Sequence, residues 1–96
     1  MIIAVDFDGT LQLDDCSANV ALMQRLIAEQ RRGAVVILWT TREGRRLMEA
    51  VKFCGQHGLR FAYVNQNAPE AIRMLGHDSR KIYADIYIDD KAVRPW

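Results

Sequence analysis

The sequence predicts a three-layer α/β/α sandwich around a Rossmann-like parallel sheet, and two observations support that prediction. Short, wholly apolar runs, which are typical of strands buried on both faces of a sheet, alternate along the chain with segments of helical periodicity. The connections between these segments are short, which favours right-handed crossovers between parallel strands. We expect one domain over residues 1–96, of which 50% are hydrophobic.

The first predicted strand is the apolar run Ile2–Val5, which is followed by a polar loop. Ser17 is a suitable N-cap for a helix that extends to about Arg32, and Gly33 would end that helix. The apolar face of this helix is expected to comprise Val20, Met23, Leu26 and Ile27.

The second predicted strand is Ala34–Trp39, with Trp39 expected in the core. Thr41–Glu43 would turn the chain into a second helix that ends at His57 and Gly58. The residues expected to share the apolar face of this helix are Leu47, Ala50, Val51 and Cys54.

The remaining elements are a third strand at Phe61–Val64, a short helix, and a fourth strand within Ile82–Ile88. The short helix is expected to be capped by Asn67 and to end at Gly76. Pro69 suits its first turn, and Ile72 and Leu75 would point inward.

Composition argues against several classes of partner. The net charge of +1 arises from 13 basic and 12 acidic residues, so bulk charge does not indicate a nucleic-acid or membrane partner. No apolar stretch is long enough to cross a bilayer, and the N-terminus lacks the features of a signal peptide. Cys16 and Cys54 do not form a C-x-x-C pair, so we do not expect a zinc site. Two isolated cysteines fit a protein of the reducing cytoplasm.

Reactive side chains follow three of the predicted strands. Asp6 and Asp8 directly follow the first, Thr40-Thr41-Arg42 follows the second, and Asp89-Asp90 follows the fourth. Because the carboxyl ends of parallel strands meet at one edge of a sheet, we expect these groups to lie together. Carboxylate oxygens suit Mg²⁺, and a bound cation would relieve the repulsion among them. A carboxylate can also attack phosphorus, while a second carboxylate moves the protons.

On these residues the chain resembles the haloacid dehalogenase (HAD) superfamily, whose members are mostly phosphatases. Four family motifs occur in order and span nearly the whole chain. Motif one is Asp6-Phe7-Asp8-Gly9-Thr10, and motif two is Thr40 after an apolar strand. Motif three is Lys81 (with Arg80 as the alternative occupant), and motif four is Asp89-Asp90. The chain is similar to short members without a cap domain, and the family's sheet order implies strands arranged 4-1-2-3.

The resemblance implies a Mg²⁺-dependent phosphatase and a role for each motif residue. Asp6 would be the nucleophile that forms an aspartyl-phosphate, and Asp8 the general acid/base. Thr40 would bind a phosphoryl oxygen, and Lys81 would balance negative charge. The implied metal ligands are Asp6, Asp8 through its backbone carbonyl, Asp89 and Asp90. The residues expected at the substrate are Gly9, Thr41 and Arg42.

Departures from the family pattern leave alternatives open. The segments between Thr10 and Ser17 and between Val64 and Lys81 are too short for a folded cap, so an open site for a bulky or macromolecular phosphorylated substrate is expected. The family's usual final strand is absent before Trp96, which is expected in an exposed tail or at an interface. A homo-oligomer is one expectation from this pattern. A catalytically weak or inactive module that binds a metal or a partner is the alternative function.

Overall fold

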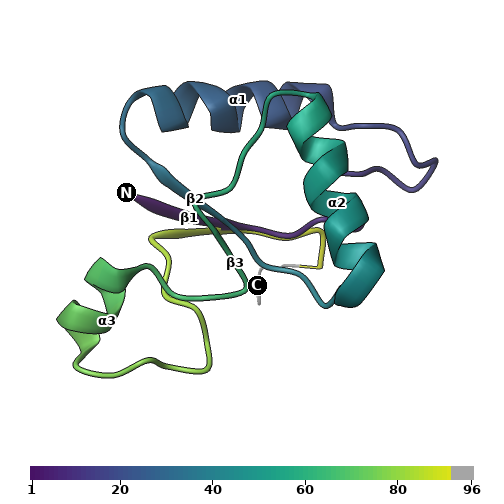
Figure 1. Cartoon of the computed structure of the whole chain (residues 1–96). Helices are drawn as coiled ribbons and strands as arrows, with labels where there is room; N and C mark the ends of the chain where they lie inside the picture. Colours follow the sequence, from purple (N-terminus) through teal and green to yellow (C-terminus); the bar gives the residue numbers. More distant parts are fainter. Residues whose placement is uncertain (92–96) are drawn as a thin grey trace, which may run out of the picture.

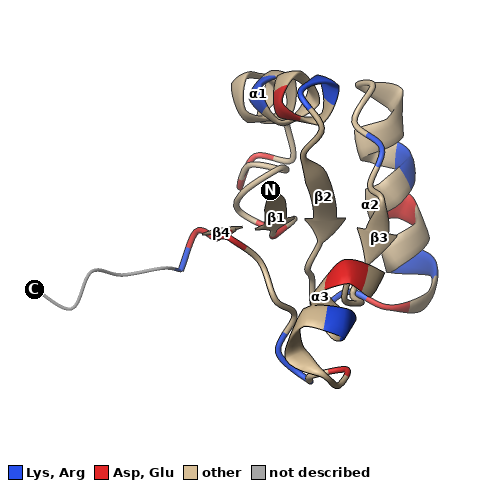
Figure 2. Cartoon of the chain, turned by 90° about the vertical axis from the view of Figure 1, so that its left-hand side faces the viewer, with Lys and Arg blue, Asp and Glu red and all other residues tan. Residues whose placement is uncertain are grey.

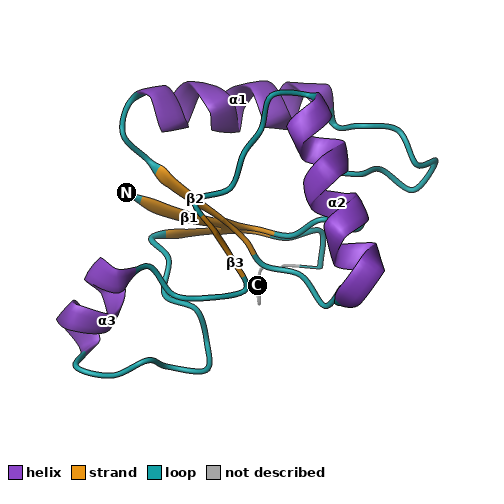
Figure 3. Cartoon of the chain, in the orientation of Figure 1, coloured by secondary structure: helices purple, strands orange, loops and turns teal. Residues whose placement is uncertain are grey.

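A computed structural model describes residues 1–91 of the chain, so the expectation for Trp96 lies outside the described residues. The elements are β1 (Ile2–Val5), α1 (Val20–Arg31), β2 (Val35–Leu38), α2 (Gly44–Gln56), β3 (Tyr63–Val64), α3 (Pro69–Leu75) and β4 (Ile86–Ile88). These four strands pair in parallel, and their order is β3-β2-β1-β4, which confirms the predicted order (Figures 1 and 3).

Helices cover both faces of the sheet, as a three-layer sandwich requires. Side chains alternate across a strand, so successive residues of β1 and β2 enter different clusters. Ile3 and Val5 pack in the larger cluster with α1 and α2. Ile2 and Ala4 pack in the smaller one with Ala71 of α3. Figure 1 shows α1 and α2 on one side of the sheet and α3 on the other.

The start of α1 differs from the prediction. Asn19, not Ser17, is the N-cap, and its side-chain oxygen accepts a hydrogen bond from the backbone N–H of Leu22 (3.3 Å). Ser17 instead donates its hydroxyl to Asp15, two residues earlier. Because the helix starts at Val20, that residue stays exposed, whereas Met23 and Leu26 are buried as predicted.

Strands β2 and β3 are shorter than predicted, because β2 loses one residue at each end of its apolar run and β3 starts two residues later than its run. Trp39 follows β2 and is 36% exposed, so its predicted place in the core is wrong. Only Tyr63 and Val64 of the predicted third strand pair with β2. On α2, Ala50 and Cys54 are buried as expected, but Val51 is exposed.

The short helix α3 is not capped by Asn67. Ala68 occupies the N-cap position without a side-chain hydrogen bond, and the buried Asn67 side chain contacts the segment before β4 instead. Gly76 ends the helix in a left-handed conformation (φ 81°), as predicted. Ala71 is the buried residue of this helix, whereas Leu75 is exposed, because α3 meets the sheet through its first turn.

Within residues 1–91, no helix combines the length and the apolar character needed to cross a membrane. Cys54 is buried and Cys16 is exposed in the loop before α1, and both are free thiols.

Candidate active site at the carboxyl ends of the strands

Three carboxylates that follow the neighbouring strands β1 and β4 converge at the carboxyl ends of the strands. Asp6 follows β1, and Asp89 and Asp90 follow β4, which pairs with β1 in register from Ile3–Ile86 to Val5–Ile88. The backbone N–H of Asp6 continues this pairing by donating to the Ile88 carbonyl (2.9 Å). One oxygen from each of the three carboxylates lies within 4.8 Å of the others. Figure 2 shows the acidic end of β4 beside the end of β1.

The motif-one turn holds Asp90 from two sides. Gly9 has φ 78°, and a Cβ atom at this position would collide with the Asp90 carboxylate. The buried Thr10 hydroxyl accepts a hydrogen bond from the Asp90 backbone N–H (3.1 Å). Gly9 and Thr10 therefore fix the position of a candidate metal ligand. Gly9 was expected at the substrate, but it lies against Asp90.

The environment of Asp6 disfavours its charged form. Burial raises the pKa of the Asp6 carboxyl, and the nearby Asp89, Asp90 and Asp8 raise it further, while a backbone hydrogen bond from Phe7 opposes the effect. A group whose ionised form is destabilised by other carboxylates gains most from a cation placed among them. The electrostatics of Asp6 therefore fit a cation site.

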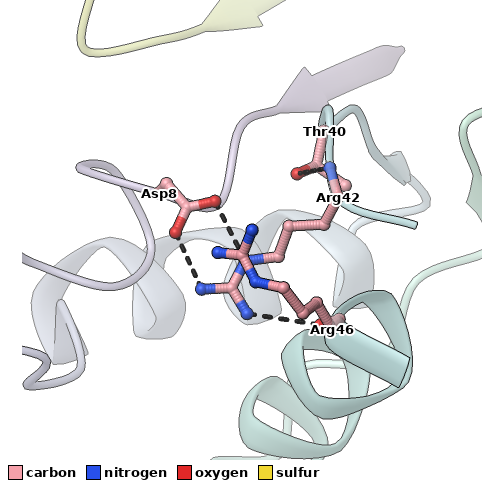
Figure 4. A network of polar contacts seen from close by, with 4 residues as sticks. All are labelled: Asp8, Thr40, Arg42 and Arg46. Atoms are coloured by element: carbon pink, nitrogen blue, oxygen red, sulfur yellow. Dashed lines mark hydrogen bonds and ion pairs between the residues drawn. The ribbon is translucent and has the colours of Figure 1, made fainter. Parts of the chain in front are cut away.

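Asp8 points away from this cluster and pairs with Arg42. The two side chains form a bidentate ion pair, with Nη2 to Oδ1 at 2.8 Å and Nε to Oδ2 at 3.0 Å (Figure 4). The hydrogen bonds from Arg42 lower the pKa of the Asp8 carboxyl, and Arg46 adds to the effect. The side chain of Asp8 is not part of the three-carboxylate cluster, which is compatible with the expectation that only its backbone carbonyl would reach a metal.

The end of β2 supplies hydroxyl groups to the same edge. The backbone N–H of Thr40 donates to the Asn65 side-chain oxygen (2.8 Å), so the ends of β2 and β3 are tied together. The Thr40 hydroxyl accepts a hydrogen bond from the backbone N–H of Arg42 (3.1 Å), which fixes the turn into α2 (Figure 4). Thr41 is exposed in that turn.

Lys81 is not brought to the acidic cluster. Its ammonium nitrogen lies 5.2 Å from the centre of the Tyr87 ring, and the side chain is exposed. Among residues 1–91, the ion pairs within 4.0 Å do not include Lys81 or Arg80. The role of Lys81, or of Arg80, in balancing charge at Asp6 stays a prediction.

The donor set fits a hard divalent cation such as Mg²⁺. All the converging atoms of Asp6, Asp89 and Asp90 are carboxylate oxygens, and two of the three residues are exposed. Mg²⁺ prefers oxygen ligands and retains several waters, which an open site of this kind allows. The same oxygens would also accept Mn²⁺, and the ligand chemistry does not separate the two ions.

Two contacts of the site were not predicted from the sequence. One is the Arg42–Asp8 pair, since Arg42 was assigned to the substrate. The other is the Asn65 side chain on Thr40. Asn65 has a left-handed backbone (φ 53°), and the only sequence signal for it was an asparagine directly after a strand.

Comparisons with known proteins give one informative relationship. No protein-family model matches the chain, and no curated protein matches it. A solved structure, described as that of a conserved protein from Bacteroides thetaiotaomicron, is 38% identical in sequence. The alignment covers 97% of this chain and 78% of that one, with a TM-score of 0.78.

Proposed function

This chain belongs to the same family as the conserved protein from Bacteroides thetaiotaomicron, and we propose a function for it. The proposal is based on the chemistry of the site at the carboxyl ends of the strands. The proposed activity is that of a Mg²⁺-dependent phosphatase that hydrolyses phosphomonoesters through an aspartyl-phosphate on Asp6. It follows the resemblance of the four sequence motifs to the HAD superfamily. The free thiols of Cys16 and Cys54 support a reducing compartment, so we place the activity in the cytoplasm.

One observation carries the proposal. Asp6, Asp89 and Asp90 are far apart in sequence, yet one oxygen of each lies within 4.8 Å of the others at the carboxyl ends of β1 and β4. Open α/β sheets bind their ligands at this edge. A turn rich in Asp and Gly would explain either segment alone, but it does not explain their convergence.

A bound Mg²⁺ would be held by Asp6, Asp89 and Asp90, and it would neutralise negative charge on a phosphoryl group. The chain's own residues would then perform the two half-reactions. In the first, the Asp6 carboxylate attacks phosphorus, the bond from phosphorus to the ester oxygen breaks, and Asp8 gives a proton to the departing oxygen. In the second, Asp8 takes a proton from a water that attacks the same phosphorus, which releases Asp6 and inorganic phosphate.

The exposure of the site supports a large substrate. Asp89 and Asp90 are exposed, and about half of the Asp8 side chain is open to solvent. Specificity would therefore depend on the rim of the site, where Thr41, Arg45 and Arg46 are exposed. We propose a bulky or macromolecular phosphorylated substrate, and comparing phosphorylated oligonucleotides, phosphopeptides and sugar phosphates tests this part separately. Turnover of small sugar phosphates alone would contradict it.

Hydrolysis of a generic aryl phosphate tests the central proposal. We expect turnover with Mg²⁺, loss of turnover with EDTA, and loss of at least about 10³-fold in kcat in the Asp6→Asn variant, because the covalent step is removed. Asp14→Asn, in the exposed loop before α1, is the matched control for loss of one charge. Normal turnover in Asp6→Asn would refute the mechanism.

A second candidate function is a metal- or partner-binding module without turnover. It is favoured by one observation, the bidentate Arg42–Asp8 pair, which keeps the proposed acid ionised. Mg²⁺ binding by calorimetry combined with no hydrolysis of any phosphomonoester class would select this alternative. Measurable Mg²⁺-dependent turnover would remove it.

A further inference from the structure

The side chain of Arg42 is unusually constrained for an arginine beside an open site. It is 12% exposed, although Asp8, its partner, is 49% exposed. Its guanidinium carbon lies 4.6 Å from the centre of the buried Phe7 ring. Phe7 in turn makes an edge contact with Phe53 of α2, with ring centres 5.8 Å apart. The guanidinium group is thus fixed against the core.

The hydrogen bonds of Arg42 are largely used inside the protein. Nε and Nη2 donate to the two oxygens of Asp8, and Nη1 donates to the backbone carbonyl of Arg46 (3.2 Å). A guanidinium has five N–H bonds, so most of its donor capacity is committed. An arginine that binds a substrate phosphate would be expected to have its paired N–H groups free to donate to the phosphate oxygens.

The loop geometry explains how this position is reached. The backbone N–H of Arg42 donates to the Thr40 hydroxyl, so the side chain starts from a fixed turn at the end of β2. Its far end is bound to a carbonyl in the first turn of α2. Arg42 therefore connects the end of β2, the start of α2 and the motif-one loop, as Figure 4 shows.

From this geometry we infer that Arg42 is a positioning residue, which holds the carboxylate of Asp8 in place to accept the proton of the attacking water and does not bind the substrate. The inference rests on the proposed function, and it revises the expectation that Arg42 contacts the substrate. Without Arg42, the half-exposed Asp8 side chain would be free to rotate. A misplaced catalytic group commonly costs about 10²-fold in rate, with little effect on substrate binding.

The test measures kcat and KM for Mg²⁺-dependent hydrolysis of an aryl phosphate by Arg42→Ala and Arg42→Lys. We expect kcat to fall by at least about tenfold in both variants while KM changes less than about threefold. Arg42→Lys keeps the positive charge and most of the packing but cannot form the bidentate pair with Asp8. It therefore tests the inference even if Arg42→Ala does not fold. Full kcat in Arg42→Lys would overturn the inference.

Two further readouts separate positioning from substrate binding. Free guanidinium at millimolar concentrations should raise the kcat of Arg42→Ala, whereas a purely structural defect would not respond. The Kd of inorganic phosphate in the presence of Mg²⁺, measured by calorimetry, should be unchanged. A phosphate Kd weakened tenfold or more, or a higher KM with kcat retained, would show instead that Arg42 binds the substrate.

The control is Arg31→Ala, which removes an exposed arginine from the last turn of α1, at the opposite edge of the sheet from the site. It should retain the kcat of the wild-type protein. Absence of Mg²⁺-dependent turnover in both the wild-type protein and this control would refute the proposed function itself. Turnover in these two proteins with unchanged kcat in both Arg42 variants would refute only the role given to Arg42.

Discussion

The α-carbon of Gly9 lies against the carboxylate of Asp90, so closely that a Cβ atom at Gly9 would overlap Asp90 Oδ2. The contact joins the loop after β1 to the loop after β4. It gives the glycine of motif one a second role besides its left-handed backbone, because any side chain there would displace a candidate metal ligand.

Gly9→Ala is therefore expected to impair the metal site and the fold together. The left-handed conformation (φ 78°) should cost about 1–2 kcal/mol of stability. The collision should also weaken Mg²⁺ binding, as measured by calorimetry. Gly33→Ala is the matched control, since Gly33 also has positive φ (97°) but nothing lies within 4 Å of its Cβ position. Equal Mg²⁺ affinity in the two variants would contradict the role of the Gly9–Asp90 contact.

The raised pKa of Asp6 predicts how the metal-free protein responds to pH. Because the folded-state pKa lies above the reference value of 3.8, folding favours the protonated form. Stability should then fall as pH rises from about 3.8 through the folded-state pKa, and stay reduced at neutral pH. In EDTA at pH 7, Asp6→Asn should therefore melt at a higher temperature than the wild-type protein, and the difference should shrink in acid.

The same pair of proteins should respond differently to Mg²⁺. The ion should raise the Tm of the wild-type protein more than that of Asp6→Asn, since a ligand that binds more tightly stabilises the folded state more. Thermal melts with EDTA and with Mg²⁺ measure both effects. A wild-type protein that is more stable than Asp6→Asn in EDTA would contradict the raised pKa of Asp6.

The buried Asn67 is expected to be a main support of the segment that carries Lys81. Its amide donates to the Ser79 carbonyl (3.0 Å) and to Asp78 (2.9 Å), and its oxygen accepts from the Tyr83 N–H (2.8 Å). Asn67→Ala should cost about 2–3 kcal/mol in urea unfolding, because backbone groups near the core lose their partners. Gln66→Ala, at the exposed neighbouring position, should change stability by less than about 0.5 kcal/mol. Equal losses in the two variants would contradict this role.

The two cysteines should differ sharply in reactivity. Burial raises the pKa of the Cys54 thiol to about 12, so little thiolate forms at neutral pH, whereas Cys16 is exposed. A thiol reagent should modify Cys16 rapidly in the folded protein and reach Cys54 only after unfolding in urea. Peptide mass spectrometry identifies the modified residue. Rapid labelling of Cys54 in the folded protein would indicate that the packing around α2 opens readily.

The sequence was sufficient to predict the layers and the convergence of the carboxylates that follow β1 and β4. Unbroken apolar runs locate buried parallel strands, and a parallel sheet necessarily brings the residues after β1 and β4 to one edge. The family resemblance added the strand order, which the structure confirms.

The errors arose where tertiary contacts decide between local alternatives. Ser17 and Asn19 are both good caps, and the hydrogen bonds between the 11–13 and 17–19 segments place Asn19 at the helix start. Trp39 was assigned to the core as the last residue of an apolar run, although the sheet ends before it. The Arg42–Asp8 pair joins residues separated by 34 positions, and no local pattern specifies such a partner.

The most direct test of the central claim is to trap the aspartyl-phosphate. An acyl phosphate, unlike a free carboxylate, is reduced by borohydride, so a phosphorylated aspartate is converted to homoserine. After incubation with an aryl phosphate and Mg²⁺, peptide mass spectrometry should find homoserine at position 6, and EDTA should abolish it. Mg²⁺-dependent hydrolysis that leaves Asp6 unmodified would contradict the account.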